Sequence, residues 1–178
     1  MNLPESIKNQ TRVLILSDNP YYASLVVENF NRQSRALDYQ LLNGESEQNT
    51  GCDFFLYANS DPNTLLSYKP TIVLIGTDAS AQLTTQQIES ITPGGIIIYH
   101  SSDSNVEQLL SESKTYLRKI PFDDPTISQG LLETPDGALP ISEINESQKI
   151  SISAAKELLQ HMGIMDEEFY ESLLDFSW

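Results

Sequence analysis

The stretch that decides the fold is "VLILSDNPYYASLVVENF", from Val13 to Phe30. Its first four residues are aliphatic, as in a strand that is covered on both faces of a parallel sheet. Pro20 then precedes apolar residues at helical spacing, which predicts a helix over 20–33. In many nucleotide-binding domains a glycine-rich loop at this junction holds phosphate. Here the junction, Ser17 to Tyr22, contains no glycine, lysine or arginine.

Short apolar runs continue along the first two thirds of the chain, and several are continuous rather than alternating. Helical stretches fall between some of them, and this alternation is typical of a mainly parallel sheet. We therefore predict an α/β fold with a five- or six-stranded, mainly parallel twisted sheet flanked by helices, and with the first strand inside the sheet. The expected strands are 12–16, 38–42, 53–57, 71–75, 95–99 and 115–120, and the expected helices between them are 20–33, 84–91 and 104–114.

The last third of the chain has a different pattern. Pro135-Asp136-Gly137 lies between two apolar arms, which predicts a hairpin. Two helices are expected after it, one near 151–162 that ends at Gly163 and one over 166–175 that Asp166 caps. The apolar residues of the final helix are expected to pack in the core rather than on a partner. We expect a single domain over 1–178 with a loose N-terminus over 1–11.

The composition limits the partners. The chain has 25 Asp and Glu against 10 Lys and Arg, a formal net charge of −15. Such a surface repels nucleic acid and anionic lipid, so we expect neither nucleic acid nor membrane as a partner. A purely solubilising role is the simpler explanation of the charge. Cys52 is the only cysteine, which excludes an intrachain disulfide. The start has no apolar segment of a secretory signal, and no run approaches the ~18 apolar residues of a membrane span, so we expect a cytoplasmic protein.

The order of these elements and two motifs resemble the central, ATP-binding domain of the Mur ligases, which build the peptidoglycan stem peptide. "GGIIIYHSSDSN", 94–105, is similar to the family's G-G-x-x-V-x-N-x-D-D-x-N strand and turn. "SISAAKELLQHMGIMDEEFYESLLDF", 151–176, is similar to its N-A-x-A-A … L-G-I segment and the helix that follows. The likeness runs from about Arg12 to Phe176. It implies a P-loop-like fold and a link to cell-wall metabolism.

The phosphate loop departs from the family pattern G-T-x-G-K-T/S. Tyr21 stands where the resemblance puts the lysine, Pro20 removes a backbone donor, and Asp18 adds a negative charge. Two unit charges ~4 Å apart interact by about 4 kcal/mol at an effective dielectric constant of ~20. We therefore expect no strong binding of ATP or magnesium, and we interpret Asn19-Pro20 as the N-cap and first turn of a helix.

Other positions that the resemblance implies for magnesium and adenine also differ. Tyr57 and Asn59 stand where acidic groups are expected, which leaves Asp61 nearby. Asp78 is retained, but Ser80 and Ala81 (or Gln82) replace an Asp-His pair, and Ser151 replaces an adenine-contacting Asn. The tripartite ligases also carry a sugar-nucleotide domain before this one and an amino-acid-binding domain after it, and we expect neither in this chain.

Two functions remain open. The first is a non-catalytic Mur-ligase-like domain, a binding or scaffold module for a protein or small molecule, with no catalytic residue, metal ligand or cofactor. The alternative is a nucleotide- or small-ligand-binding enzyme that uses a rebuilt site at the C-terminal edge of the sheet, for example with Asp78, His100 and Asp103. His100 follows a buried strand, where α/β sites often lie, although a structural histidine explains it as well. The candidate cleft residues are Ser17, Asp18, Asn19, Asp78, Ser80, His100, Asp103 and Ser151.

Overall fold

The computed structural model describes residues 7, 9–48 and 51–178. A central sheet has seven strands in the order β3-β2-β4-β1-β5-β6-β7. All neighbouring pairs are parallel except β2 with β3. Its strands are β1 (Thr11–Leu16), β2 (Asp38–Gln40), β3 (Ser46–Glu47), β4 (Phe54–Asn59), β5 (Ile72–Ile75), β6 (Ile96–His100) and β7 (Arg118–Phe122).

The central position of β1 confirms the prediction from its aliphatic run. It pairs with β4 on one side and β5 on the other, so that Val13 lies between Leu56 and Ile72. Because side chains alternate along a strand, Val13 and Ile15 point to one face of the sheet and Leu14 and Leu16 to the other. All four are fully buried, as a strand with both faces covered requires.

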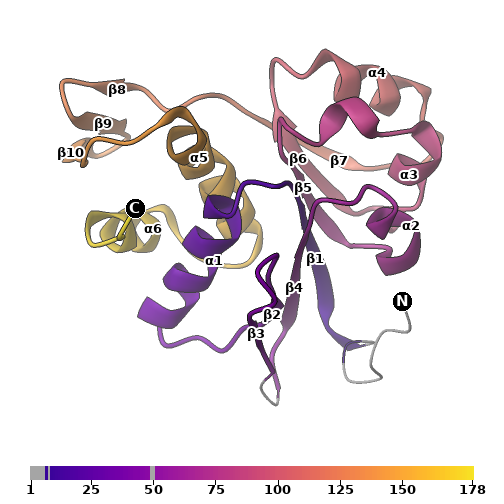
Figure 1. Ribbon diagram of the computed structural model, residues 1–178, viewed down its shortest axis with the longest axis horizontal. Coiled ribbons are helices and arrows are strands. Elements are labelled where there is room, and N and C mark those ends of the chain that lie inside the picture. Colours follow the sequence, from indigo (N-terminus) through magenta and orange to yellow (C-terminus); the bar gives the residue numbers. More distant parts are fainter. Residues whose placement is uncertain (1–6, 8, 49–50) are drawn as a thin grey trace.

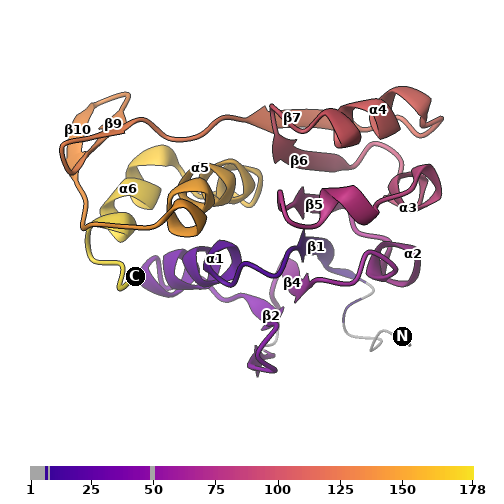
Figure 2. The same cartoon turned by 45° about the horizontal axis from the view of Figure 1, so that its top comes forward.

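Helices cover both faces of the sheet, as Figures 1 and 2 show. One face carries three helices and packs the core that we name the α1-side core; the other face carries three further helices and packs the α2-side core. The α1-side helices are α1 (Tyr21–Arg32), α5 (Glu146–His161) and α6 (Asp166–Leu174), and the α2-side helices are α2 (Thr64–Tyr68), α3 (Thr85–Glu89) and α4 (Ser104–Glu112).

A small antiparallel sheet lies beyond the α1-side helices, joined to β7 by an extended segment (Figure 1). It consists of β8 (Ile127–Ser128), β9 (Leu131–Thr134) and β10 (Gly137–Pro140). Thr134 pairs with Gly137, so Pro135 and Asp136 form the two-residue loop and Gly137 has a φ of +135°. The predicted hairpin is confirmed, and β8 adds a strand that was not expected.

Several element boundaries differ from the prediction. β3 and α2 were not predicted, and β7 lies at 118–122 rather than 115–120. Helix α5 begins at Glu146 rather than near 151, because Asn145 and Gln148 form a capping box before it. Helix α6 is present, but Met165 is its N-cap and Asp166 its first residue. Its Phe169 and Leu173 are buried in the core as expected, whereas Leu174 is 52% exposed and does not pack there.

The N-terminal residues were expected to be loose over 1–11. Residues 1–6 and 8 lie outside the described part of the chain. Ile7 is buried in the α2-side core, and the Gln10 side chain donates to Asp38 at 2.7 Å and to the Cys52 carbonyl at 3.1 Å. β1 already begins at Thr11. Within the described residues, no helix is both long and apolar enough to cross a membrane.

Candidate functional site

The carboxyl ends of β1 and β5 meet at the point where the chain changes direction across the sheet. The next strands in the chain, β2 and β4, lie on one side of β1 in the sheet. The later strands, β5, β6 and β7, lie on its other side. In open α/β sheets, ligands bind in the crevice outside such a switch point. Ser17 follows β1, and Gly76 to Asp78 follow β5, so these two loops form the candidate site.

The Asp78 carboxylate bridges the two loops. The Ser17 hydroxyl donates to Oδ1 of Asp78 at 2.7 Å, and the Asp18 backbone N–H donates to Oδ2 at 2.5 Å. The Asn19 backbone N–H donates in turn to Ser17 Oγ at 3.0 Å. A backbone N–H and a hydroxyl at this position are donors of the kind that hold phosphate in related loops. Here an acidic side chain of the protein itself already uses them.

Gly76 allows the two loops to approach this closely. A Cβ at position 76 would lie 2.5 Å from Ser17 Oγ and 2.6 Å from Ser17 Cβ, and it would also clash with Oδ1 of Asp78. Ser17 is fully buried and has no room to move aside. Glycine is therefore required here by close packing, since its φ is not in the left-handed region.

Asn19 ties the start of α1 to α5. Its Oδ1 accepts from the Tyr21 backbone N–H at 3.1 Å, while its Nδ2 donates to the Ser147 carbonyl at 2.9 Å and to Ser151 Oγ at 3.0 Å. Pro20 is the N-cap residue rather than part of the first turn, so Asn19, which was expected to be the N-cap, lies one residue before it and accepts from the first helical N–H. The loop at 17–20 is a fixed helix start.

A hollow of about 400 Å³ lies beside this loop. Asp18 and Asp78 both line it, and no lysine or arginine does. The Tyr22 hydroxyl faces the same region, where burial and then the charge of Asp78 raise the pKa of Tyr22 to about 12. The hollow is therefore unfavourable for an anion. Its remaining lining residues are Asn19, Pro20, Tyr21, Thr77, Asn145, Ser147 and Ile150.

The other candidate residues have separate partners. Asp103 is the N-cap of α4 and accepts from the Val106 N–H at 3.1 Å. Ser80 is buried in a single 3₁₀ turn, η2 (Ser80–Gln82), and its carbonyl accepts from Asn105 Nδ2 at 2.5 Å. The Asp103 backbone N–H donates to the His100 carbonyl at 2.9 Å, but no side-chain hydrogen bond or ion pair found among the described residues joins His100, Asp103 and Asp78. Ser17, Asp18, Asn19, Asp78 and Ser151 thus form one network, and the remaining three do not belong to it.

His100 lies at the end of β6 in a polar environment of its own. Its Nδ1 is 2.7 Å from Ser102 Oγ, and its Nε2 is 3.4 Å from a carboxylate oxygen of Asp124. The ring meets Phe122 edge to face at 5.3 Å between centroids. The imidazole thus lies between a hydroxyl and a carboxylate, although its buried Nε2 makes no hydrogen bond with the described residues.

The positions that the resemblance assigned to magnesium form a turn. Asn59 Nδ2 donates to the Tyr57 hydroxyl at 2.8 Å, and Asn59 Oδ1 accepts from the Asp61 N–H at 2.8 Å. In the part of the chain that the structure describes, no three His, Cys, Asp or Glu side chains are grouped so that they could hold a metal ion.

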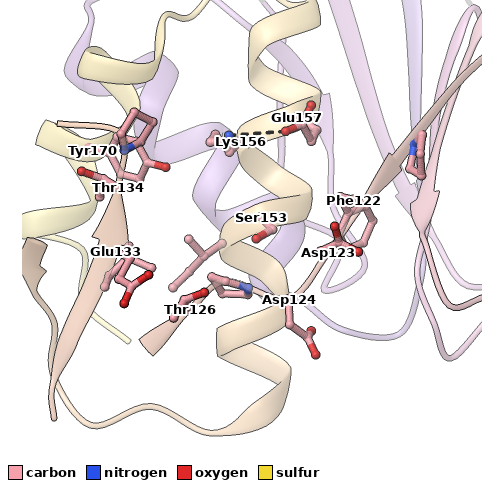
Figure 3. Close-up of a pocket in the computed structure, with 15 residues that line it drawn as sticks. Phe122, Asp123, Asp124, Thr126, Glu133, Thr134, Ser153, Lys156, Glu157 and Tyr170 are labelled. Carbon is pink, nitrogen blue, oxygen red and sulfur yellow. Dashed lines mark ion pairs between the residues drawn. The ribbon is translucent and has the colours of Figure 1, made fainter. Parts of the chain in front are cut away.

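Sequence reasoning missed a second hollow, of about 500 Å³, between α5, the segment after β7 and the small sheet (Figure 3). The only sequence signal for it was the Asp123-Asp124 pair directly after β7. Its walls come from segments far apart in the chain, which meet where the hairpin lies beside α5 and α6. The labelled residues around it are Phe122, Asp123, Asp124, Thr126, Glu133, Thr134, Ser153, Lys156, Glu157 and Tyr170.

Comparisons with known proteins find solved structures of the same fold, whereas no family model and no curated protein matches the chain. The UDP-N-acetylmuramate:L-alanyl-gamma-D-glutamyl-meso-diaminopimelate ligase (MPL) from Neisseria meningitides matches with a TM-score of 0.70 and 10% identity over 98% of this chain and 68% of its own. MurF from Acinetobacter baumannii matches with a TM-score of 0.70 and 13% identity over 98% of this chain and 48% of its own.

Escherichia coli FolC, solved in complex with DHPP and ADP, matches with a TM-score of 0.61 and 7% identity over 96% of this chain and 58% of its own. The chain thus spans between about half and two thirds of these proteins. At such identities the likeness is one of fold, and it confirms the resemblance that the sequence motifs indicated. The chain has the fold of the central domain of the Mur ligases, with a self-bridged loop where that resemblance places the phosphate loop.

Proposed function

We propose that this domain is a non-catalytic, Mur-ligase-like binding or scaffold module that acts in cell-wall (peptidoglycan) metabolism. The link to the cell wall rests on the fold, which it shares with MurF and with a ligase named for UDP-N-acetylmuramate. The absence of catalysis rests on one observation above all, the Asp78 carboxylate that bridges Ser17 and Asp18.

The charges around the loop oppose a phosphate group. A phosphate that took the Asp18 N–H would have to displace the Asp78 carboxylate and remain close to both acidic side chains. A single like-charge contact at ~4 Å costs about 4 kcal/mol at an effective dielectric constant of ~20. Millimolar affinity corresponds to only about 4.1 kcal/mol, so one such repulsion is enough to cancel it.

Metal binding is not expected to compensate. Of the three positions assigned to magnesium, only Asp61 carries a charge, and its neighbours Tyr57 and Asn59 are hydrogen-bonded to each other. Magnesium in proteins is bound by carboxylates together with substrate phosphates. This loop offers magnesium only one carboxylate, and it does not favour the phosphate that would supply further ligands. We therefore expect neither ATP nor magnesium to bind strongly.

A second candidate function is an enzyme or small-ligand-binding protein with a rebuilt site at the carboxyl edge of the sheet. The contacts of His100 favour it, because an imidazole between a hydroxyl and a carboxylate has the arrangement of a general base. Asp78 and Asp103 do not take part in this arrangement, so the rebuilt site would be centred on His100, Ser102 and Asp124.

Calorimetric titration with ATP and magnesium, combined with a phosphate-release assay across candidate amino acids, tests the proposal. We expect no binding and no turnover at millimolar nucleotide. Binding tighter than ~100 μM, about 5.5 kcal/mol, or any turnover would overturn it, and turnover that a His100→Ala variant abolishes would establish the second candidate.

A charge-only variant separates the role of Asp78 from that of loop shape. Asp78→Asn keeps the size of the side chain but removes its charge, and Asp136→Asn on the hairpin loop is the matched control. We expect inorganic pyrophosphate to raise the melting temperature of Asp78→Asn more than that of the control or the wild type. Equal responses of all three proteins would contradict the argument that this carboxylate excludes anions.

A further inference from the structure

The hollow beside α5 has the size and position of a small-molecule site. Its volume of about 500 Å³ lies in the range of ligand pockets. It opens at the carboxyl end of β7, on the edge of the sheet where α/β proteins bind ligands. It shares no residue with the hollow beside Asp78, so it is a separate place on the molecule.

The bottom of this hollow is apolar and fixed. Phe122, Leu132 and Ile152 contribute to it, and each is at most 4% exposed. They come from β7, β9 and α5, and all three belong to the α1-side core. Because these side chains are already almost completely buried, they leave little surface to cover. A hydrocarbon group that reached them would gain mainly by removing its own apolar surface from water.

The rim of the hollow is acidic. Asp123, Asp124, Glu133 and Glu157 line it, against one lysine. That lysine, Lys156, is 3.4 Å from Glu157 and is therefore already paired (Figure 3).

Two of these acids also have partners of their own. Asp123 accepts from the Ser101 hydroxyl, and Asp124 faces His100. Glu133 is exposed on β9, and its carboxylate has no ion-pair partner in the described part of the chain. The hollow therefore has an excess of negative charge that a cation would neutralise.

We propose that this hollow binds a small aliphatic diamine, with its hydrocarbon part across the apolar bottom, one ammonium group between Glu133 and Asp124, and the other at the remaining carboxylates of the rim. The cavity gives the position of the site, and its carboxylates require a ligand with a positive charge. An ammonium group fits better than a metal ion, because no described group of acidic residues is arranged to coordinate one. The hydroxyls of Thr126 and Ser153 are available to further polar groups of the ligand, whereas that of Thr134 already donates to the Gly137 carbonyl at 2.9 Å.

This inference rests on the proposed function in one respect, since it names the ligand class of a domain proposed to bind rather than to catalyse. Titration of the full chain with 1,6-diaminohexane at 150 mM salt tests it, with 1-hexanol and hexanoate as neutral and anionic probes. We expect saturable binding of the diamine at one site, weaker binding of hexanol, and none of hexanoate. Absence of saturation at 10 mM diamine would overturn the proposal.

Variants separate the pocket from diffuse attraction to an acidic protein. Glu133→Gln and Asp124→Asn are each expected to weaken diamine binding about threefold, and the double variant about tenfold. Glu171→Gln, at an exposed glutamate of α6 outside the lining, is the matched control and should leave binding unchanged. Equal weakening by the control and by the pocket variants would show that the surface charge alone attracts the amine.

A steric variant tests the same site without any change in charge. Ser153→Trp places a large ring in the hollow and should abolish diamine binding while circular dichroism stays unchanged. Unaltered binding by a folded Ser153→Trp variant would overturn the proposal. If the protein binds the amine and also turns over ATP, only the proposed function is refuted. If it neither turns over ATP nor binds the amine, only the proposed amine site is refuted.

Discussion

Gly76→Ala is the most direct test of the packed loop at the switch point. The new Cβ would lie 2.5 Å from Ser17 Oγ and 2.6 Å from Ser17 Cβ, distances that side chains essentially never adopt. Position 76 has no positive φ, so alanine is compatible with the backbone and the whole cost is steric. Because Ser17 is fully buried, we expect the Asp78 side chain to be displaced and its bridge to be lost.

The magnitude follows from the contacts that break. Overpacking a closed site costs about 1–3 kcal/mol. Each hydrogen bond to a charged group is worth about 1.5–3 kcal/mol, and exposure of Asp18 places its bond at or below the lower end of that range. Since the loop can relax by giving up one bond rather than both, we expect a loss of about 3 kcal/mol in the free energy of unfolding. For a chain of 178 residues, this is a fall in Tm of roughly 6–12 °C.

Urea unfolding followed by circular dichroism measures this loss. The slope of the unfolding free energy against urea concentration should stay unchanged if only the native state is affected. Gly44→Ala is the control for backbone strain, because Gly44 has a φ of +86° and open space around it; we expect it to cost about 1–2 kcal/mol. A Gly76→Ala variant within ~0.5 kcal/mol of the wild type would refute the close-packing argument. Additive costs of Gly76→Ala and Asp78→Ala would show that the two residues are not coupled.

Three further predictions concern the rest of the fold. Burial and then the charge of Arg118 lower the pKa of His161 below its usual 6.5. As the pH falls through about 6.5, the unfolded chain is therefore protonated at this residue before the folded chain, and stability falls. The His161→Gln variant should show a smaller fall in Tm than the wild type between pH 7.5 and 5.5. Tyr68→Phe removes a buried hydroxyl that donates to a β4 carbonyl at 2.9 Å, and should cost about 1–2 kcal/mol in urea unfolding with no change in secondary structure. Asn145→Ala removes the cap of α5 and should cost about 0.5–2 kcal/mol, whereas a loss below that range would contradict a capping role.

Much of the fold was predictable because the central strands are buried on both faces. The aliphatic runs of β1 and β5 have no polar residue to interrupt them, and both lie inside the sheet. The edge was less predictable. Pro121 cannot donate to a ladder, and proline within a strand is found mainly at a sheet edge. β7 is such an edge strand and continues past Pro121, whereas the predicted strand at 115–120 stopped before it. Strand β3 has two residues and no apolar pattern, and only its pairing with β2 defines it.

The candidate site was predictable in its residue types but not in its contacts. The loop of Ser17, Asp18 and Asn19 departs so clearly from a phosphate loop that its composition alone predicts weak phosphate binding. No sequence rule, however, links Asp78 to Ser17 or Asn19 to Ser151, because the separations of 61 and 132 residues are bridged only in the folded sheet. The hollow beside α5 was missed for the same reason, since its lining comes from β7 and the segment after it, β9, α5 and α6, which share no motif.

The division of the core between the two faces of the sheet has a consequence for synthesis on the ribosome. The α2-side core is built entirely from residues up to Leu117, so all of its parts are available when the first two thirds of the chain have emerged. The α1-side core needs residues of α5 and α6 up to Leu173. The hydrogen bonds of the Asn19 side chain to Ser147 and Ser151 also form only after α5 has been synthesised. Until then, the apolar side of α1 and the matching face of β1 are exposed in the nascent chain, and this surface is the one for which a chaperone would compete.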